Sequence, residues 1–133
     1  MADQLDPRSV ADASRSLRLR VGIADDDADL RAILAQFVQI LGHQVVCSVG
    51  DGQSLLDQSA LQEIDLALVD FDMPFDGLAV AEELSRTKQI PVIMVSGHSD
   101  LEMMVHPEEP VSEYLRKPVS LEMLNAAIAA VIR

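Results

Sequence analysis

The sequence lacks the features expected of a secreted or membrane-bound protein. Its single cysteine, Cys47, cannot form a disulfide within the chain, which fits a protein of the reducing cytosol. Because Cys47 stands in an apolar strand pattern, we expect it to be an inert core thiol. The apolar runs are short, and the run from Leu66 to Val69 has only the length of a strand, whereas a membrane span needs ~20 residues. No apolar core follows a basic stretch near the N-terminus, so we expect no signal peptide. Together these absences favour a cytoplasmic protein.

Basic residues are also scarce. Ten lysines and arginines face 22 acidic residues, which gives a formal net charge of −12. Such a surface does not attract nucleic-acid phosphates or anionic membranes, so we expect direct binding to neither. A chain of 133 residues that is 49% apolar suits one domain with its own core. Residues 1–17 are polar and show no apolar periodicity, which predicts a flexible N-terminal arm before one domain over residues 18–133.

Strand and helix patterns alternate along that domain. Apolar runs predict strands, and apolar residues three and four apart predict helices. Pro107 and Pro110 leave room for only a short or irregular fourth helix, over residues 99–106. Gly42 is placed to end the first helix and Ser120 to cap the last. The expected strands are 19–23, 45–49, 66–69, 90–95 and 114–115; the other helices are 30–41, 55–60, 78–84 and 121–132. This order predicts an α/β fold with a doubly wound, five-stranded parallel sheet.

Chemically reactive residues follow several of these strands. In such sheets, ligands bind beyond the carboxyl ends of the strands. Asp25 and Asp26 follow the first strand, Asp70 the third, Ser96 the fourth and Lys117 the fifth. We therefore expect three carboxylates, a hydroxyl and an ammonium group to meet in one crevice.

This set of groups suits metal-assisted phosphoryl transfer. Three adjacent carboxylates repel one another unless a cation lies among them, and Mg²⁺ prefers carboxylate, water and phosphate oxygens. An aspartate carboxylate is also a competent nucleophile toward phosphorus. Lys117 could neutralise charge on the transferred group, and the Ser96 hydroxyl could donate a hydrogen bond to it.

Four segments resemble the motifs of response-regulator receiver domains in two-component signal transduction. The resemblance covers residues 18 to 132, with the segments in the family's order and spacing. The segments are Val-Gly-Ile-Ala-Asp-Asp-Asp (21–27), Asp-Leu-Ala-Leu-Val-Asp-Phe-Asp-Met-Pro (65–74, followed by Gly77), Val-Ile-Met-Val-Ser-Gly (92–97) and Tyr-Leu-Arg-Lys-Pro (114–118). The resemblance implies a chemotaxis-type receiver with the flavodoxin-like strand order 2-1-3-4-5.

The resemblance also implies a role for each matching residue. Asp70 would accept a phosphoryl group from a histidine kinase or a histidine phosphotransfer protein, with Lys117 and Ser96 contacting its oxygens. Ser96 and Tyr114 would form the conformational switch. The Mg²⁺ ligands would be Asp25, Asp26, Asp70 and the backbone carbonyl of Asp72. Such a domain catalyses only its own phosphorylation and dephosphorylation. It signals through contacts with a downstream protein, which the sequence does not identify. The domain could also form a homodimer.

Two regions depart from the family pattern. Asp72 and His98 stand at variable positions that flank the site, and we hypothesise that they approach each other and tune the lifetime of the phosphoryl group; alternatively, both are solvated loop residues. Near the short fourth helix, Met103, Met104 and Val105 form either an adaptable partner-binding patch or part of the core.

The sequence leaves two other functions open. One is a receiver-like interaction module that works without phosphorylation, which the altered fourth helix would suit. The other, more remote, is a phosphohydrolase of the haloacid dehalogenase class, because Asp70-Phe71-Asp72 reads as that family's Asp-x-Asp motif. However, that family places the motif near the start of the chain, before its acidic metal-binding pair, whereas here the acidic pair comes first.

Overall fold

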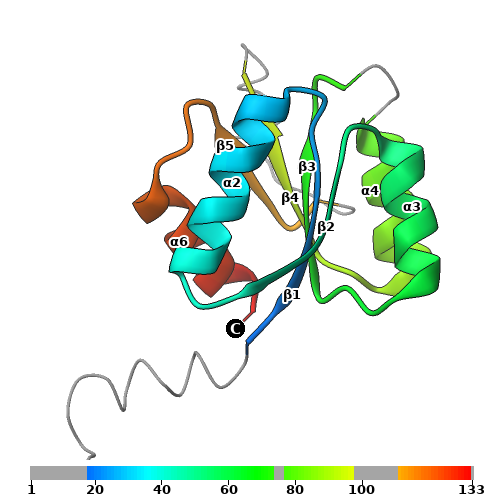
Figure 1. The fold of residues 1–133 in the computed structure, drawn as a ribbon. Helices are drawn as coiled ribbons and strands as arrows, with labels where there is room; N and C mark the ends of the chain where they lie inside the picture. The colour runs from blue at the N-terminus through cyan, green and yellow to red at the C-terminus, as the bar shows by residue number, and fades with distance from the viewer. Residues whose placement is uncertain (1–17, 74–76, 98–110, 133) are drawn as a thin grey trace, which may run out of the picture.

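A computed structural model describes residues 18–73, 77–97 and 111–132, and the element labels follow Figure 1. Its centre is one parallel sheet with the order β2-β1-β3-β4-β5. The strands are β1 (Arg20–Ala24), β2 (Gln44–Val49), β3 (Leu66–Asp70), β4 (Val92–Ser96) and β5 (Glu113–Arg116). This arrangement confirms the predicted fold class and strand order.

The helices cover both faces of the sheet (Figure 1). They are α2 (Ala28–Ile40), α3 (Gly52–Leu61), α4 (Gly77–Lys88) and α6 (Leu121–Val131). Helices α2 and α6 lie on one face and share a core with the sheet that includes Leu34 and Leu124. Helices α3 and α4 lie on the other face, over a second core that includes Leu55 and Leu84. The central strands β3 and β4 are buried along their whole length, as expected for strands that are covered on both faces.

Local hydrogen bonds set where these elements begin and end. Ser120 caps α6 by accepting a hydrogen bond from the Met123 N–H, and Gly42 follows α2 with a left-handed φ of 93°, so both predictions are confirmed. Strand β4 begins two residues later than predicted. The Ile90 N–H donates to the Leu84 carbonyl, a bond that closes the C-terminal end of α4, so Ile90 is not part of the strand.

The edge strand β2 is less buried than the sequence pattern indicates. Cys47 is only partly buried there, although it packs against the second core and burial raises the pKa of its thiol. An edge strand lacks a neighbour on one side, which explains this exposure. In contrast, His43 is buried just before β2, and its Nδ1 accepts a hydrogen bond from the Leu19 N–H.

Some predictions fall outside the part of the chain that the structure describes. These are the arm over residues 1–17, the fourth helix over residues 99–106 and the surface patch at Met103, Met104 and Val105. Among the described residues, no helix combines the length and apolar character that crossing a membrane requires.

Candidate functional site

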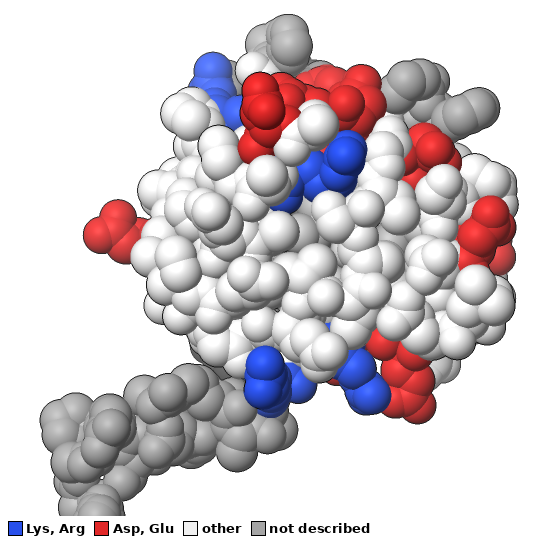
Figure 2. All heavy atoms as spheres, in the orientation of Figure 1, with Lys and Arg blue, Asp and Glu red and all other residues white. Residues whose placement is uncertain are grey.

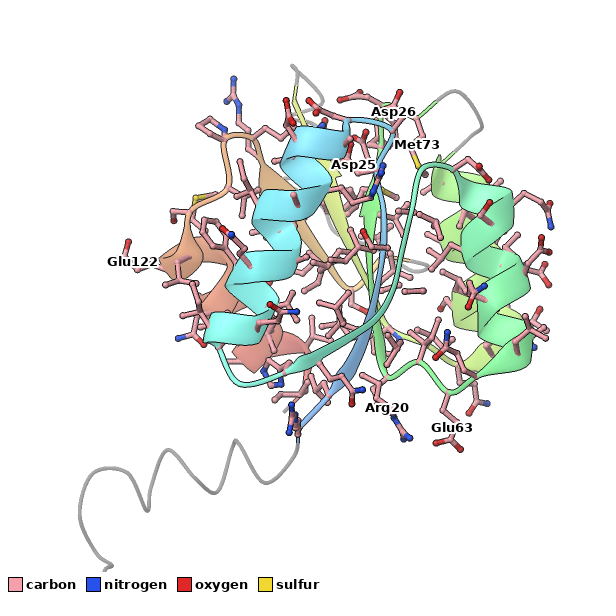
Figure 3. The ribbon with its side chains drawn as sticks, viewed as in Figure 1. Arg20, Asp25, Asp26, Glu63, Met73 and Glu122 are labelled. Atoms are coloured by element: carbon pink, nitrogen blue, oxygen red, sulfur yellow. The ribbon has the colours of Figure 1, made fainter. Side chains whose placement is uncertain are left out.

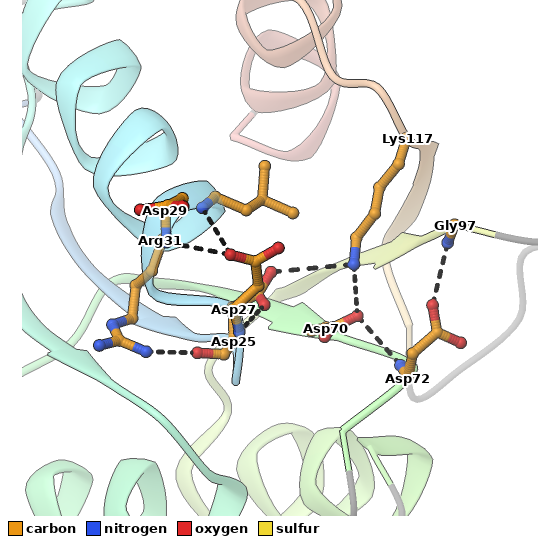
Figure 4. Close-up of polar contacts among 9 residues, drawn as sticks. Asp25, Asp27, Asp29, Arg31, Asp70, Asp72, Gly97 and Lys117 are labelled. Atoms are coloured by element: carbon orange, nitrogen blue, oxygen red, sulfur yellow. Dashed lines mark hydrogen bonds and ion pairs between the residues drawn. The ribbon is translucent and has the colours of Figure 1, made fainter.

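The predicted site residues meet at the carboxyl edge of the sheet (Figures 3 and 4). Asp70 ends β3 and Asp25 directly follows β1, and the two residues are 2% and 1% exposed. Asp26 is exposed beside them, and one carboxylate oxygen from each of the three residues lies within 4.8 Å of the others. The surface above this edge is strongly acidic (Figure 2). The β1–β3 pairing therefore builds the carboxylate cluster that the sequence predicts.

Lys117 brings a positive charge into this cluster. Its backbone N–H donates to the Ser96 carbonyl, which holds the residue beside the end of β4. Its Nζ lies 3.0 Å from Asp70 Oδ1 and 4.0 Å from Asp25 Oδ2. Burial opposes the charge on Lys117, but the hydrogen bond to Asp70 and the charges of the surrounding aspartates outweigh it and raise the lysine pKa. Lys117 is therefore a firmly charged ammonium group.

Asp25 is held in place by backbone contacts on both sides. Its N–H donates to the Val49 carbonyl, and its own carbonyl accepts from Arg31 Nη1 at 2.6 Å. Its Oδ1 accepts from the Asp27 N–H at 2.8 Å. Burial raises the pKa of Asp25 to about 6, with a further contribution from the charge of Asp70 and opposition from the Asp27 N–H. A cation at this position would offset the repulsion between the carboxylates.

Asp72 connects the end of β3 with the end of β4. Its N–H donates to Asp70 Oδ1 at 3.0 Å, while its own Oδ2 accepts from the Gly97 N–H at 3.1 Å (Figure 4). The residue is exposed, but its carboxylate is not simply solvated, because it bonds across the crevice. His98, the proposed partner of Asp72, lies outside the described residues.

Ser96 and Tyr114 lie on the neighbouring strands β4 and β5. Ser96 ends β4 and is 1% exposed. Tyr114 is half-buried, pairs in register with Met94 and packs against the second core. Both predicted switch residues are therefore within the sheet that carries Asp70.

Three contributors to the site were given no role from the sequence, although two of them, Gly77 and Gly97, belong to the segments that resemble the family's motifs. Arg31 bonds the Asp25 carbonyl, and Gly97 supplies the N–H that Asp72 binds. Gly77, at the start of α4, lies so close to Asp70 that an added Cβ would be 2.9 Å from the Asp70 carbonyl oxygen. The Asp-x-x-x-x-x-Arg spacing from Asp25 and the glycine directly after β4 were the available signals, but neither identifies these contacts without the fold.

The carboxylate cluster fits a divalent cation. Asp25 Oδ2 and Asp70 Oδ2 are buried and have no hydrogen-bond partner among the described residues. Buried carboxylate oxygens without a hydrogen bond are costly, and a hard cation with oxygen ligands removes that cost. Asp26 adds a third, exposed carboxylate to the same position.

The structure thus combines a doubly wound α/β fold with a buried aspartate, a facing lysine and an acidic cluster that fits a cation. The family model for the response regulator receiver domain matches residues 21–129, and the chain belongs to this family. Receiver domains are generally non-enzymatic modules of two-component signal transduction, which argues against the phosphohydrolase alternative.

Named relatives and solved structures agree with this assignment. The transcriptional regulatory protein PdtaR of Mycobacterium tuberculosis is 31% identical over 119 residues, which cover 88% of this chain and 58% of that protein. The chain thus spans little more than half of that relative's length. A response regulator receiver domain from Clostridium thermocellum has a TM-score of 0.75 at 27% identity, covering 86% of this chain and 95% of that one. The BeF₃-activated receiver domain of nitrogen regulatory protein C has a TM-score of 0.68 at 29% identity, covering 86% and 94%.

Proposed function

We propose that this domain is a phospho-accepting receiver whose acceptor is Asp70. The observation that carries the proposal is the environment of Asp70 itself. Its carboxylate is buried at a strand end, with Oδ1 bonded to Lys117 and to the Asp72 N–H and with Oδ2 lacking a hydrogen bond among the described residues. Phosphorylation on aspartate is general to the receiver family.

The proposed reaction transfers a phosphoryl group from a phosphohistidine to Asp70. A carboxylate oxygen of Asp70 attacks phosphorus in line, an O–P bond forms, and the P–N bond to the imidazole breaks. The imidazole nitrogen leaves with the electron pair of that bond and takes up a proton. Lys117 already lies 3.0 Å from Asp70, so its charge offsets the negative charge of the phosphoryl oxygens without rearrangement.

Mg²⁺ is the proposed cofactor. Asp25, Asp26 and Asp70 would hold it through their carboxylates, with the Asp72 carbonyl as a further ligand. When bound, the ion would neutralise charge on the carboxylates and on the phosphoryl oxygens. Two hydrogen bonds orient Asp25 for this role: Arg31 donates to its backbone carbonyl, and the Asp27 N–H donates to its Oδ1. The Oδ2 atom of Asp25 is then left to face the cluster.

The proposed output is a change in protein–protein contacts. A phosphoryl group carries roughly −1.5 to −2 charges and replaces the single charge of the Asp70 carboxylate, so the net negative charge at this residue rises by about one or less. Ser96, one strand away, would move toward it as a hydrogen-bond donor, and Tyr114 on β5 would change its exposure. The partners proposed are a histidine kinase or phosphotransfer protein upstream and an unidentified protein downstream, with homodimerisation as one route of output.

We also propose that Asp72 and His98 tune the lifetime of the phosphoryl group, so alanine at either position should change the dephosphorylation rate.

Acetyl phosphate tests this function directly. With Mg²⁺, the protein should gain the mass of one phosphoryl group, and the Asp70→Asn variant should gain none. Lys117→Met loses the ammonium group, so it should gain the label more slowly. Labelling of Asp70→Asn would place the acceptor elsewhere. No labelling of the wild-type chain, and no binding of beryllium fluoride, would instead favour the interaction module that works without phosphorylation.

A further inference from the structure

The Asp72 side chain accepts a hydrogen bond from the backbone N–H of Gly97, beside the proposed phosphorylation site. Its Oδ2 accepts a hydrogen bond from the Gly97 N–H at 3.1 Å, at the end of β4. Figure 4 shows this contact beside the Lys117–Asp70 pair. The Asp72 carboxylate is thus bound close to the position where the phosphoryl group on Asp70 is expected.

Gly97 and Lys117 border the same small space. A Cβ built on Gly97 would lie 3.3 Å from Lys117 Cδ and 3.4 Å from Asp72 Oδ2. Lys117 Nζ in turn lies 3.0 Å from Asp70 Oδ1. A group attached to Asp70 and bonded to Lys117 therefore lies within reach of the strand end that carries Gly97.

Negative groups in this space compete for the positive charge of Lys117 and for the Gly97 N–H. The negative charge of Asp72 contributes to the raised pKa of Lys117, as do those of Asp70 and Asp25. A phosphoryl group carries roughly −1.5 to −2 charges in place of the single charge of the Asp70 carboxylate, and its oxygens can accept hydrogen bonds from backbone N–H groups at strand ends. The Asp72 carboxylate and the phosphoryl oxygens would then compete for the Gly97 N–H and repel each other.

We propose that Asp72 acts as an internal competing anion: it holds the Gly97 N–H in the unphosphorylated state and is displaced when Asp70 carries a phosphoryl group. This inference rests on the proposed function, because it concerns the same site. Asp72 is exposed, so its side chain has solvent into which it can turn. Its backbone N–H is bonded to Asp70 Oδ1, so rotation of the side chain can move the carboxylate away from Gly97 while the backbone stays in place.

The competition has a measurable consequence for binding of a phosphoryl mimic. Asp72→Ala frees the Gly97 N–H and removes one repelling charge while leaving the backbone N–H and carbonyl of residue 72 in place. Because a hydrogen bond to a charged group is roughly twice as strong as a neutral one, beryllium fluoride with Mg²⁺ should bind this variant about tenfold more tightly than the wild-type domain. Asp72→Asn keeps an acceptor without the charge and should fall between the two.

A control variant separates the effect of the Asp72–Gly97 hydrogen bond from the effect of lowering the net negative charge at this end of the molecule. Asp29→Ala removes one acidic charge from the same end of the molecule, in the first turn of α2, where the side chain makes no contact with Gly97. It should change the affinity by less than about twofold at physiological salt, because exposed charges are screened. Urea unfolding of each variant, without metal, checks that the folded state is retained.

The experiment titrates ¹⁵N-labelled protein with beryllium fluoride in the presence of Mg²⁺. The Gly97 amide signal should lie downfield in the free wild-type domain and move upfield in free Asp72→Ala, and the variant should bind about tenfold more tightly. An unchanged Gly97 signal, or equal affinities for Asp72→Ala and Asp29→Ala, would overturn the inference while leaving the receiver function intact. Failure of all of these proteins to bind beryllium fluoride and to be labelled by acetyl phosphate would overturn the proposed function and the inference together.

Discussion

Acidification should weaken the fold through His43, which lies at the end of the sheet opposite the phosphorylation site. His43 is 7% exposed, and its Nδ1 accepts a hydrogen bond from the Leu19 N–H at 3.1 Å. The Leu19 carbonyl also accepts from the Gln44 N–H, so the imidazole joins the start of β1 to the start of β2. Protonation of Nδ1 would turn this acceptor into a donor that faces another donor.

The direction of the effect follows from the histidine pKa. Burial, and secondarily the charge of Arg18, lower the pKa of His43 below its ordinary value of 6.5. The unfolded chain therefore binds a proton more readily than the folded chain. The contribution of His43 to stability is complete above about pH 6.5 and is lost as the pH falls through that value toward the folded pKa. One group can supply a slope of at most about 1.4 kcal/mol per pH unit.

Two variants isolate this group. His43→Asn retains a side-chain oxygen that can accept from the Leu19 N–H but cannot be protonated in this range. His43→Ala leaves that N–H without its partner, which should cost about 1–3 kcal/mol near neutral pH. Urea unfolding of all three proteins from about pH 5 to about pH 7.5 gives the free energy of unfolding. The wild-type value should fall relative to that of His43→Asn as the pH decreases; parallel curves for these two proteins would refute the reasoning.

Three further outcomes are expected elsewhere. Mg²⁺ should raise the free energy of unfolding by about 1.4 kcal/mol at ten times its dissociation constant, and Asp26→Asn should reduce this gain in the same urea titration; equal gains would exclude Asp26 as a ligand. Gly77→Ala should destabilise the domain by about 1–3 kcal/mol in urea, because its Cβ would lie 2.9 Å from the Asp70 carbonyl oxygen, and a neutral result would show that α4 adjusts freely. Ser120→Ala should cost about 0.5–2 kcal/mol by removing the cap of α6, whereas Ser120→Asp should be tolerated; equal losses would argue against the capping bond.

The strand-end residues were predictable because of the topology of parallel sheets. Once strands alternate with helices, residues such as Asp25, Asp70 and Lys117 must come to one edge, whatever the details of packing. The cross-site bond from Asp72 to Gly97 was not predictable at this level, because it depends on a side-chain rotamer and on the spacing of two loops. His43 shows the same limit, since nothing in its neighbours along the chain indicates that Leu19, 24 residues away, supplies its partner.

The two buried carboxylates divide their oxygens in the same way, and this division explains how the site stays folded before any ligand binds. Asp25 Oδ1 and Asp70 Oδ1 both accept hydrogen bonds from the chain, from the Asp27 N–H and from Lys117 together with the Asp72 N–H. The Oδ2 atoms of the same residues have no hydrogen-bond partner among the described residues. The bonded oxygens fix the orientation of each carboxylate, so the other two oxygens are held toward the cluster without reorganisation when a cation or a phosphoryl donor arrives. Because Lys117 balances only part of the negative charge, the remaining repulsion favours binding of a cation over an empty site.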